Sequence, residues 1–515
     1  MSTANINDLR LHNARNFIEA LHGPEGEYRG YVFLGRTSPW EVDNQTNEEL
    51  PPAPSSSVQE FFRTCNEMVS IQAIQSDDVF FMIRKVKWES GSVYDLYRHD
   101  YSQLRTSYSN AKNLWDASFY VINQNNIVYV CLDNNNDNPS TVEPQGDTSD
   151  PFYTSDGYLW LKIYTLSVQD AFYHSTDRYV PVTTDSYISS PVGAVYTVKI
   201  DVAGDSFTTN PLGVNNQVPY YYCRILGDGQ GAVARIAINN QSVSEVVVVR
   251  PGQGYTYGYV DFTANNSYSN LIDLDQNKNA LDPLGDGTFK SQVIISPQGG
   301  WGYNDDPLLT EEENLKKAEF AIARQLGASR VGVFSTLNYN LSEFAKEISF
   351  RQLGILQDPE FIASAGVNLN TASTAYQIKI INNNFNTNYI VGETIRQVHT
   401  FLETGEPDKY AIGKVIEWDK VTSVLKYIQV PEIHSDIDGN LYRFKGDNYI
   451  EGMQSGKIEY ADTGFSLAVD GVVFFEGYAE PQVKDYSGLI TYLTNIKPIQ
   501  RQPSQSEKIS FIISY

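Results

Sequence analysis

Apolar and polar residues alternate in short runs along most of the chain, which is the pattern of β-strands that turn one face toward a core. The two clearest runs are at residues 489–493 and 509–515. In the second run every odd-numbered position is apolar or aromatic, so we expect these side chains to face the interior of a sheet. Asn495, Lys497 and Pro498 are predicted to end the first run, because proline has no amide hydrogen for a strand ladder.

The same alternation predicts strands at residues 28–34, 80–88, 119–122, 127–132, 162–166, 178–182, 232–238, 246–249, 347–356, 376–381, 413–419 and 421–430. Three helices are predicted, because a capping residue precedes an apolar stripe in each. The caps are Asn7 or Asp8 in the first helix, Ser57 in the second, and Thr310 in the third, where Glu313 completes a capping box. Gly23 and Gly327 are predicted to stop the first and third helices.

The composition of the 515 residues fits a folded, β-rich protein, because 41% are hydrophobic and Tyr and Phe (35 and 24) far outnumber Met (4). The formal net charge is -24. Such a surface repels nucleic acid and anionic lipid, and the densest cationic stretch, residues 84–87, is too short for a basic patch. We therefore expect neither a nucleic-acid partner nor a membrane partner.

Cys65, Cys131 and Cys223 stand far apart, without a spacing typical of a metal site. An odd and sparse set of cysteines is typical of a reducing compartment, in which the thiols stay free and buried. The first twenty residues carry several charges, unlike a signal peptide, and no apolar run approaches membrane-spanning length. These features predict a soluble, acidic protein made in a cytoplasm.

Few stretches have a pattern typical of catalysis or phosphate binding. Six histidines show no pair at metal-ligand spacing: His12, His22, His99, His174, His399 and His434. The stretch around Ser466 is similar to a nucleophile elbow but lacks its last glycine. The stretch from Gly227 to Gly231 lacks the Gly-Lys-Ser and the helix of a phosphate loop, so we predict a turn there.

Two acidic stretches have part of the spacing of a calcium loop. Residues 133–137 lack the central glycine and a glutamate at the twelfth place, and in residues 436–439 the glycine comes too early. Both are predicted to be solvated turns. Carboxylates are so numerous that a glycosidase dyad stays open, although no pattern favours one. We predict that the protein is not an enzyme and has no catalytic, cofactor-binding or metal-binding residues.

Several blocks stand in the order found in a known viral family. They are Gly35-Arg36-Thr37-Ser38-Pro39-Trp40, a basic run ending at Trp88, Val128-Tyr129 with Cys131-Leu132-Asp133, Asp156-Gly157-Tyr158 with Trp160, Phe350-Arg351-Gln352 followed by Asp358-Pro359, and Ser487-Gly488 through Pro498-Ile499. Together they resemble the baseplate wedge subunit of contractile-tailed bacteriophages (myoviruses), the gene-product-eight family. The resemblance covers roughly half of the chain.

This resemblance implies a structural protein of the virion tail, assembled in the host cytoplasm, with neither enzymatic activity nor a cofactor. The family forms a symmetric dimer within each wedge and bridges gene products six, seven and ten, so a homodimer with those partners is expected here. Two alternatives stay open. One is a receptor-binding tail protein that uses the Tyr-rich inserts as a glycan surface, and the less favoured one is a tail glycosidase.

The alternating pattern and the resemblance together predict a mainly β fold with a few helices (α+β), in which a two-layer β-sandwich-like core carries inserted β-subdomains. Residues 1–185 are assigned to the N-terminal part of the core, and residues 186–300 to a glycine-punctuated β-subdomain. Residues 301–360 are assigned to a helix and the return to the core, 361–480 to a second inserted β-subdomain, and 481–515 to the closing core strands. We expect both inserts to fold as peripheral lobes.

Overall fold

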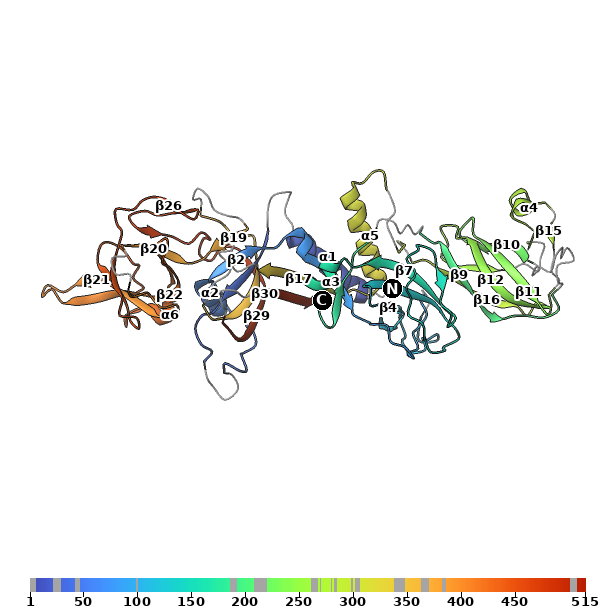
Figure 1. The fold of residues 1–515 in the computed structure, drawn as a ribbon, viewed down its shortest axis with the longest axis horizontal. Helices are drawn as coiled ribbons and strands as arrows, with labels where there is room; N and C mark the ends of the chain where they lie inside the picture. Colours follow the sequence, from blue (N-terminus) through green and yellow to red (C-terminus); the bar gives the residue numbers. More distant parts are fainter. Residues whose placement is uncertain are drawn as a thin grey trace. The chain divides into compact units, whose positions relative to one another are not determined.

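The computed structural model describes residues 6–21, 29–41, 47–98, 101–185, 192–207, 220–260, 267–268, 270–278, 280–281, 285–297, 300–301, 306–337, 348–362, 370–381, 386–500 and 507–515. The chain is mainly β with a few helices, as predicted (Figure 1). The helices are α1 (Ile6–Leu21), α2 (Val58–Asn66), α3 (Val168–Tyr173), α4 (Leu271–Gln276), α5 (Glu311–Gln325) and α6 (Pro431–His434). No helix in this part of the chain has both the length and the apolar composition needed to cross a bilayer.

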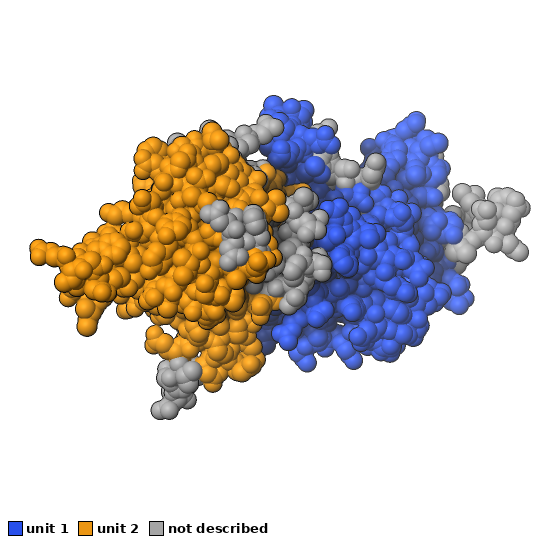
Figure 2. All heavy atoms as spheres, turned by 60° about the vertical axis from the view of Figure 1, so that its left-hand side comes forward, with its two compact units in different colours: residues 1–14, 80–332, 512–515 blue, residues 15–79, 333–511 orange. Residues whose placement is uncertain are grey.

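The chain divides into two compact units, which Figure 2 colours separately. Unit 1 contains residues 1–14, 80–332 and 512–515, and unit 2 contains residues 15–79 and 333–511. The chain passes from one unit to the other within α1, β3 (Val79–Arg84), β17 (Arg330–Leu337) and β30 (Glu507–Ser514). Each unit is therefore built from segments that are far apart in the sequence.

One sheet of unit 1 has the strand order β4-β5-β7-β6, with antiparallel neighbours. Its strands are β4 (Tyr120–Ile122), β5 (Ile127–Asn134), β6 (Phe152–Tyr153) and β7 (Tyr158–Thr165). The strands predicted at residues 119–122 and 127–132 are confirmed as β4 and β5, which pair as an antiparallel hairpin, and Asn126 in its turn has a φ of 60°. Trp160 on β7 is fully buried and stacks on Tyr158, with 5.4 Å between ring centroids. Elsewhere in unit 1, β8 (Tyr179–Pro181) pairs with β3.

The glycine-punctuated segment of unit 1 folds as two packed layers. One layer has the order β12-β11-β10-β14-β15, with β13 also paired to β10, and the other pairs β16 with β9. The strands are β9 (Val195–Val202), β10 (Tyr220–Gly227), β11 (Val233–Asn239), β12 (Ser242–Arg250), β13 (Gly258–Val260), β14 (Ser267–Tyr268), β15 (Ala280–Leu281) and β16 (Lys290–Ile295). Val195 and Val293 of one layer share a buried cluster with Ile236 and Cys223 of the other, so the layers pack as a sandwich.

The central sheet of unit 2 has the order β19-β2-β1-β18-β29. Its strands are β1 (Gly30–Gly35), β2 (Ser70–Ala73), β18 (Phe350–Gln357), β19 (Thr371–Ser373) and β29 (Leu489–Ile499). All six residues of β1 are buried, because this strand lies between β2 and β18 and has both faces covered. Tyr31, Phe33, Ile71 and Leu356 form the apolar cluster on one face.

A second sheet of unit 2 has the order β23-β22-β21-β24-β25-β20-β28, and β23 also pairs with β20, so six strands close on themselves. The strands are β20 (Tyr376–Ile381), β21 (Thr394–Phe401), β22 (Pro407–Asp419), β23 (Val424–Ile428), β24 (Tyr449–Gly452), β25 (Ile458–Ala461) and β28 (Tyr478–Ala479). A separate hairpin pairs β26 (Ala468–Val469) with β27 (Val472–Val473). Ile416 and Ile428 share a buried cluster with Val69 and Ile348, so the closed sheet packs against the rest of unit 2.

The predicted end of the strand before Pro498 is wrong, because β29 continues through this proline to Ile499. The register with β18 shifts there: Gln352 lies opposite Asn495, but Phe350 lies opposite Ile499. The extra residues on β29 form an irregular bulge, and proline is tolerated at bulges because no ladder hydrogen bond is needed there.

Other boundaries also differ from prediction. Asn7 and Asp8 lie inside α1, so neither caps it, and the predicted stop at Gly23 lies outside the described residues. The strand predicted over 80–88 ends at Arg84. The strand predicted over 421–430 is shorter, because Ser423 before β23 has a φ of 56°.

The other predicted helix ends are confirmed. The Ser57 hydroxyl accepts a hydrogen bond from the Glu60 amide at 3.2 Å and caps α2. Thr310 and Glu313 form the capping box of α5, and Gly327 follows the helix with a φ of 70°. These ends were predictable because each depends on residues a few positions apart.

Candidate functional site

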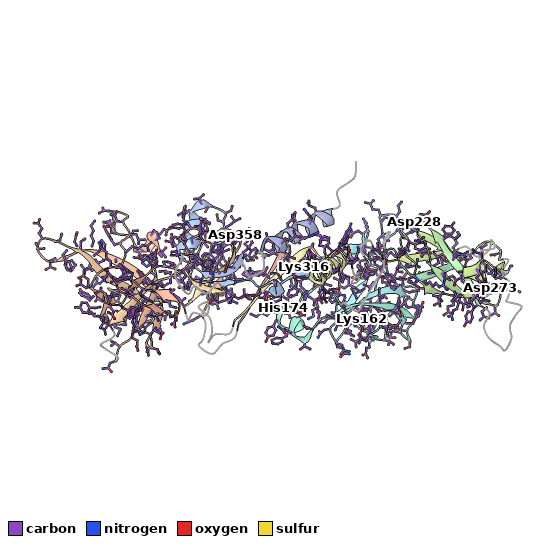
Figure 3. All side chains as sticks on the ribbon, turned by 90° about the horizontal axis from the view of Figure 1, so that it is seen from above. Lys162, His174, Asp228, Asp273, Lys316 and Asp358 are labelled. Carbon is purple, nitrogen blue, oxygen red and sulfur yellow. The ribbon has the colours of Figure 1, made fainter. Side chains whose placement is uncertain are left out.

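Two of the candidate histidines are buried, and each is held by a residue four positions earlier. His174 Nδ1 lies 2.8 Å from Asp170 Oδ1 in unit 1 (His174 is labelled in Figure 3). His434 Nδ1 accepts a hydrogen bond from the Val430 amide at 2.8 Å in unit 2. Both rings are thus fixed by local contacts that suit a structural role.

The remaining histidines do not gather into a site. His12 lies on α1 with an exposed side chain, and His399 packs its ring on Tyr442. His22 and His99 lie outside the described residues. Over the described ranges, no three His, Cys, Asp or Glu side chains group as metal ligands.

The elbow-like serine lies in a turn. Ser466 is exposed, and its hydroxyl accepts a hydrogen bond from the Glu476 amide at 3.1 Å. It follows β25 without a helix behind it, so the strand–turn–helix frame of a nucleophile elbow is not formed at this position. The stretch from Gly227 to Gly231 is the predicted turn, and a Cβ on Gly229 would lie 2.4 Å from the Tyr255 ring.

Both acidic stretches are turns that use their own carboxylates. Asp133 Oδ1 accepts a hydrogen bond from the Asn135 amide at 3.0 Å, and residues 135–137 all have positive φ. Asp436 accepts hydrogen bonds from the amides of Asp438 and Asn440 at 3.0 and 2.7 Å. The bond from Asn440 lowers the pKa of Asp436, so the carboxylate is held ionised as a turn cap.

The three cysteines are free, as predicted. Cys131 and Cys223 are buried, and Cys65 is half-buried. Burial raises the pKa of the Cys65 thiol to about 12 and that of Cys131 well above its ordinary value. A thiol that stays protonated is a poor nucleophile, so these cysteines serve packing.

A group of buried and half-buried side chains lies where β1 ends in unit 2, and we name it the junction cluster: Arg36, Trp40, Glu48, Glu67 and Arg351. Arg36 has a φ of 54° and is only 4% exposed, and its guanidinium lies 3.9 Å from the centroid of the Trp40 ring. Burial, with the charge of Arg63, lowers the pKa of Arg36. A positive φ at a buried arginine is costly, so the surrounding contacts must fix this turn.

The carboxylates of Glu48 and Glu67 connect the turn after β1 to neighbouring elements through hydrogen bonds. Glu48 accepts from the Trp40 amide at 2.7 Å and from Arg351 Nε at 2.8 Å. Glu67, fully buried after α2, accepts from the Ser38 amide at 3.0 Å. The residues after β1 are therefore bound both to α2 and to β18.

The same turn also contacts β29 and the closed sheet. Trp40 Nε1 donates to the carbonyl of Ile496 at 3.1 Å. The carbonyl of Thr37 accepts from Arg351 Nη1 at 3.1 Å and from Lys414 Nζ at 2.8 Å, and burial lowers the pKa of Lys414. These hydrogen bonds join the turn after β1 to β18, β29 and the closed sheet, and they help to hold the strands in register.

The sequence pattern identified some members of the junction cluster but not their pairing. Arg36, Trp40 and Arg351 lie in two of the sequence blocks described above. Glu48 and Glu67 carry no signal, because a glutamate in a loop or at a helix end usually lies in solvent. We find no family model that matches the sequence, and no curated protein matches it.

Proposed function

We propose that this protein is a structural subunit of a bacteriophage tail baseplate wedge, of the gene-product-eight type. In this proposal it acts as a homodimer in the virion, bridges neighbouring wedge proteins (gene products six, seven and ten by resemblance), and performs no catalysis. Its role is mechanical: it holds its neighbours in register during baseplate assembly and rearrangement.

One observation carries the proposal. Three blocks that resemble the family lie in separate parts of the sequence, at residues 35–40, 350–352 and 487–499. In unit 2 they meet, because β1, β18 and β29 are adjacent strands of one sheet. Chance resemblances have no reason to converge in space, so their convergence supports a common structural element.

The contacts among these blocks support the same interpretation. Gln352 Nε2 donates to Asn495 Oδ1 at 2.9 Å, which joins β18 to β29 through side chains that both belong to resembling blocks. Asn495 Nδ2 in turn donates to the carbonyl of Pro52 at 3.0 Å. Partly buried polar contacts of this kind favour one register, which a stiff assembly subunit needs.

The experiment is affinity purification of the tagged full-length chain from host cells during phage production. The proposal predicts co-purification of at least two other tail proteins in fixed ratio, and light scattering of the purified chain alone should give the mass of a dimer. A monomer that recovers no virion protein would contradict the proposal.

A further inference from the structure

Helix α2 of unit 2, which is labelled in Figure 1, is amphipathic, but its apolar face is turned toward solvent. The apolar residues share one face because they follow the spacing i, i+3, i+4, i+7, and we name this surface the α2 face: Val58, Phe61, Phe62 and Cys65. Val58 is 72% exposed and Phe62 is 43% exposed. An apolar helix face normally packs against a core, so an exposed one marks a surface that another element can cover.

The polar side of α2 makes the inward contacts instead. Thr64 is buried, and Glu60 Oε1 accepts a hydrogen bond from Gln352 Nε2 of β18 at 3.2 Å. Glu67, at the C-terminal cap of the helix, is fully buried and belongs to the junction cluster. The fold of unit 2 therefore uses the polar residues of α2 and leaves the apolar ones open.

A tyrosine from the turn before β29 extends the α2 face. The Tyr486 ring lies edge-on to the Phe62 ring, with 5.0 Å between ring centroids, and its hydroxyl donates a hydrogen bond to Asn66 Oδ1 at 2.8 Å. Tyr486 is 44% exposed and has a φ of 59°, which is costly for a residue other than glycine. Exposed aromatic residues of this kind are typical of the centres of protein interfaces.

The order of side chains along α2 suits a second copy of the same helix. Val58 and Phe62 are about one turn apart, or about 6 Å along the helix axis. When a two-fold axis passes between them, the small Val58 of each copy faces the large Phe62 ring of the other, and the two faces interdigitate. The α2 face is therefore complementary to itself, as a symmetric dimer requires.

The charges of the molecule favour the same surface. The formal net charge of the chain is -24, so two copies repel each other in most approaches. The α2 face itself carries no charged side chain. Charged residues beside it are already in ion pairs: Asp485 with Arg443 at 3.9 Å, and Arg63 with Glu67 and Glu41 at 3.3 and 3.6 Å. Contact through this face therefore adds little to the repulsion between copies.

We propose that a second copy of this chain docks on the α2 face, with the two α2 helices antiparallel across a two-fold axis. The inference rests on the homodimer of the proposed function and names the surface through which that dimer forms. Val58, Phe62 and Tyr486 of both copies form its apolar centre, and removing these side chains from water drives the association.

Sedimentation and light scattering of the full-length chain test this proposal with two variants. Val58→Asp and Phe62→Lys each place a charge against an apolar side chain, and the two-fold symmetry does so twice in each dimer. We expect each variant to raise the dimer dissociation constant about a hundredfold or more, so that it is a monomer at concentrations where the parent is a dimer.

Val168→Asp is the matched control. Val168 is the first residue of α3 and follows the cap Ser167, just as Val58 is the first residue of α2 and follows the cap Ser57. Val168 is 83% exposed and lies in unit 1. An aspartate in the first helical turn is favourable, so both Val→Asp variants should keep the circular dichroism spectrum of the parent, and Val168→Asp should stay dimeric.

A mixing experiment tests the antiparallel pairing. A mixture of Val58→Asp with Phe62→Lys should form a dimer that neither variant forms alone, because the introduced carboxylate of one copy then faces the introduced ammonium of the other. The second half of this mixed interface keeps the parent residues. A monomeric parent, dimers of both single variants, or a mixture that stays monomeric would each overturn the proposal.

Co-purification of tail proteins separates this inference from the proposed function. If the parent recovers tail proteins but Val58→Asp and Phe62→Lys remain dimers, the wedge proposal holds and the α2 face is not the dimer interface. If both variants are monomers and the parent dimer recovers no tail protein, the interface holds and the wedge proposal fails. Loss of a tail protein from a Val58→Asp chain that is still dimeric would assign the α2 face to a different partner and overturn the inference.

Discussion

Arg351 Nε donates a hydrogen bond to Glu48 Oε2 at 2.8 Å, although the two residues are 303 positions apart in the sequence. The side chain of Arg351 is 11% exposed and that of Glu48 is 34% exposed, so the pair is largely shielded from solvent. It joins β18 to the loop that follows β1, and the Trp40 amide shares the same carboxylate. The pair therefore links two elements of the junction cluster, β18 and the loop after β1.

Glu48→Gln should lower the free energy of unfolding by about 2 kcal/mol, because it leaves the buried Arg351 without its counter-charge. The neighbouring Glu49 provides a matched control, since it pairs with Lys497 where both side chains are exposed. We expect Glu49→Gln to leave the melting temperature unchanged. Equal melting temperatures for Glu48→Gln and the parent would show that the junction cluster does not stabilise unit 2.

Phe511→Asp should destabilise the protein by about 3 kcal/mol or more, because it places an unpaired carboxylate where a ring now packs. Phe511 on β30 is 4% exposed and lies edge-on to Tyr492, with 5.4 Å between ring centroids. Ser510→Asp is the control, since Ser510 is exposed on the same strand. Chemical denaturation checks both variants, and a parent-like midpoint for Phe511→Asp would contradict the packing described for β30.

His434 should make the protein sensitive to acid. Burial, with the charge of Lys414, lowers the pKa of His434 from 6.5 to about 4. Because the pKa is lower in the folded state, the contribution of neutral His434 is complete above pH 6.5 and is lost as the pH falls toward 4. His434→Asn, which keeps an acceptor for the Val430 amide, should reduce this loss by roughly 2 kcal/mol between pH 6.5 and 4. The measurement is the free energy of unfolding of parent and variant at several pH values between 6.5 and 4. An equal fall in both proteins would contradict the lowered pKa of His434.

Glu319 on α5 should make the protein less stable as the pH rises, which is opposite to the effect of His434. Burial, assisted by the negative charge of Asp170, raises the pKa of Glu319 from 4.5 to about 7. The folded state therefore holds a proton that the unfolded state releases, and stability falls as the pH rises from 4.5 to 7. Glu319→Gln should be more stable than the parent by roughly 2 kcal/mol at pH 8 and equal to it near pH 4. A difference in unfolding free energy between Glu319→Gln and the parent that stays constant from pH 4 to pH 8 would contradict the raised pKa of Glu319.

Much of the local structure was predictable, because it depends on residues close in sequence. The alternation over 376–381 matches β20, and the caps at Ser57 and Thr310 lie where predicted. Pro498 shows the limit of this reasoning. The register with β18 decides whether a proline ends a strand or lies in a bulge, and that register is a long-range property.

The junction cluster was beyond prediction for the same reason. Glu48 and Arg351 meet only because β1 and β18 are neighbours, and no local pattern specifies this pairing. The sequence predicted a glycine-punctuated β-subdomain between residues 186 and 300, but not which of its strands are neighbours, because strand order depends on residues that are distant in the sequence.

Mass spectrometry of purified virions tests the central claim most directly. Virions of the phage that encodes this chain under the proposal are purified on a density gradient, their tails are separated from capsids, and the peptides of each fraction are quantified against labelled standards. The wedge proposal predicts that peptides from the whole chain occur in the tail fraction, in a fixed ratio to other baseplate proteins and at two copies per wedge as the resemblance implies. Peptides confined to the infected-cell lysate, with none in intact tails, would contradict it.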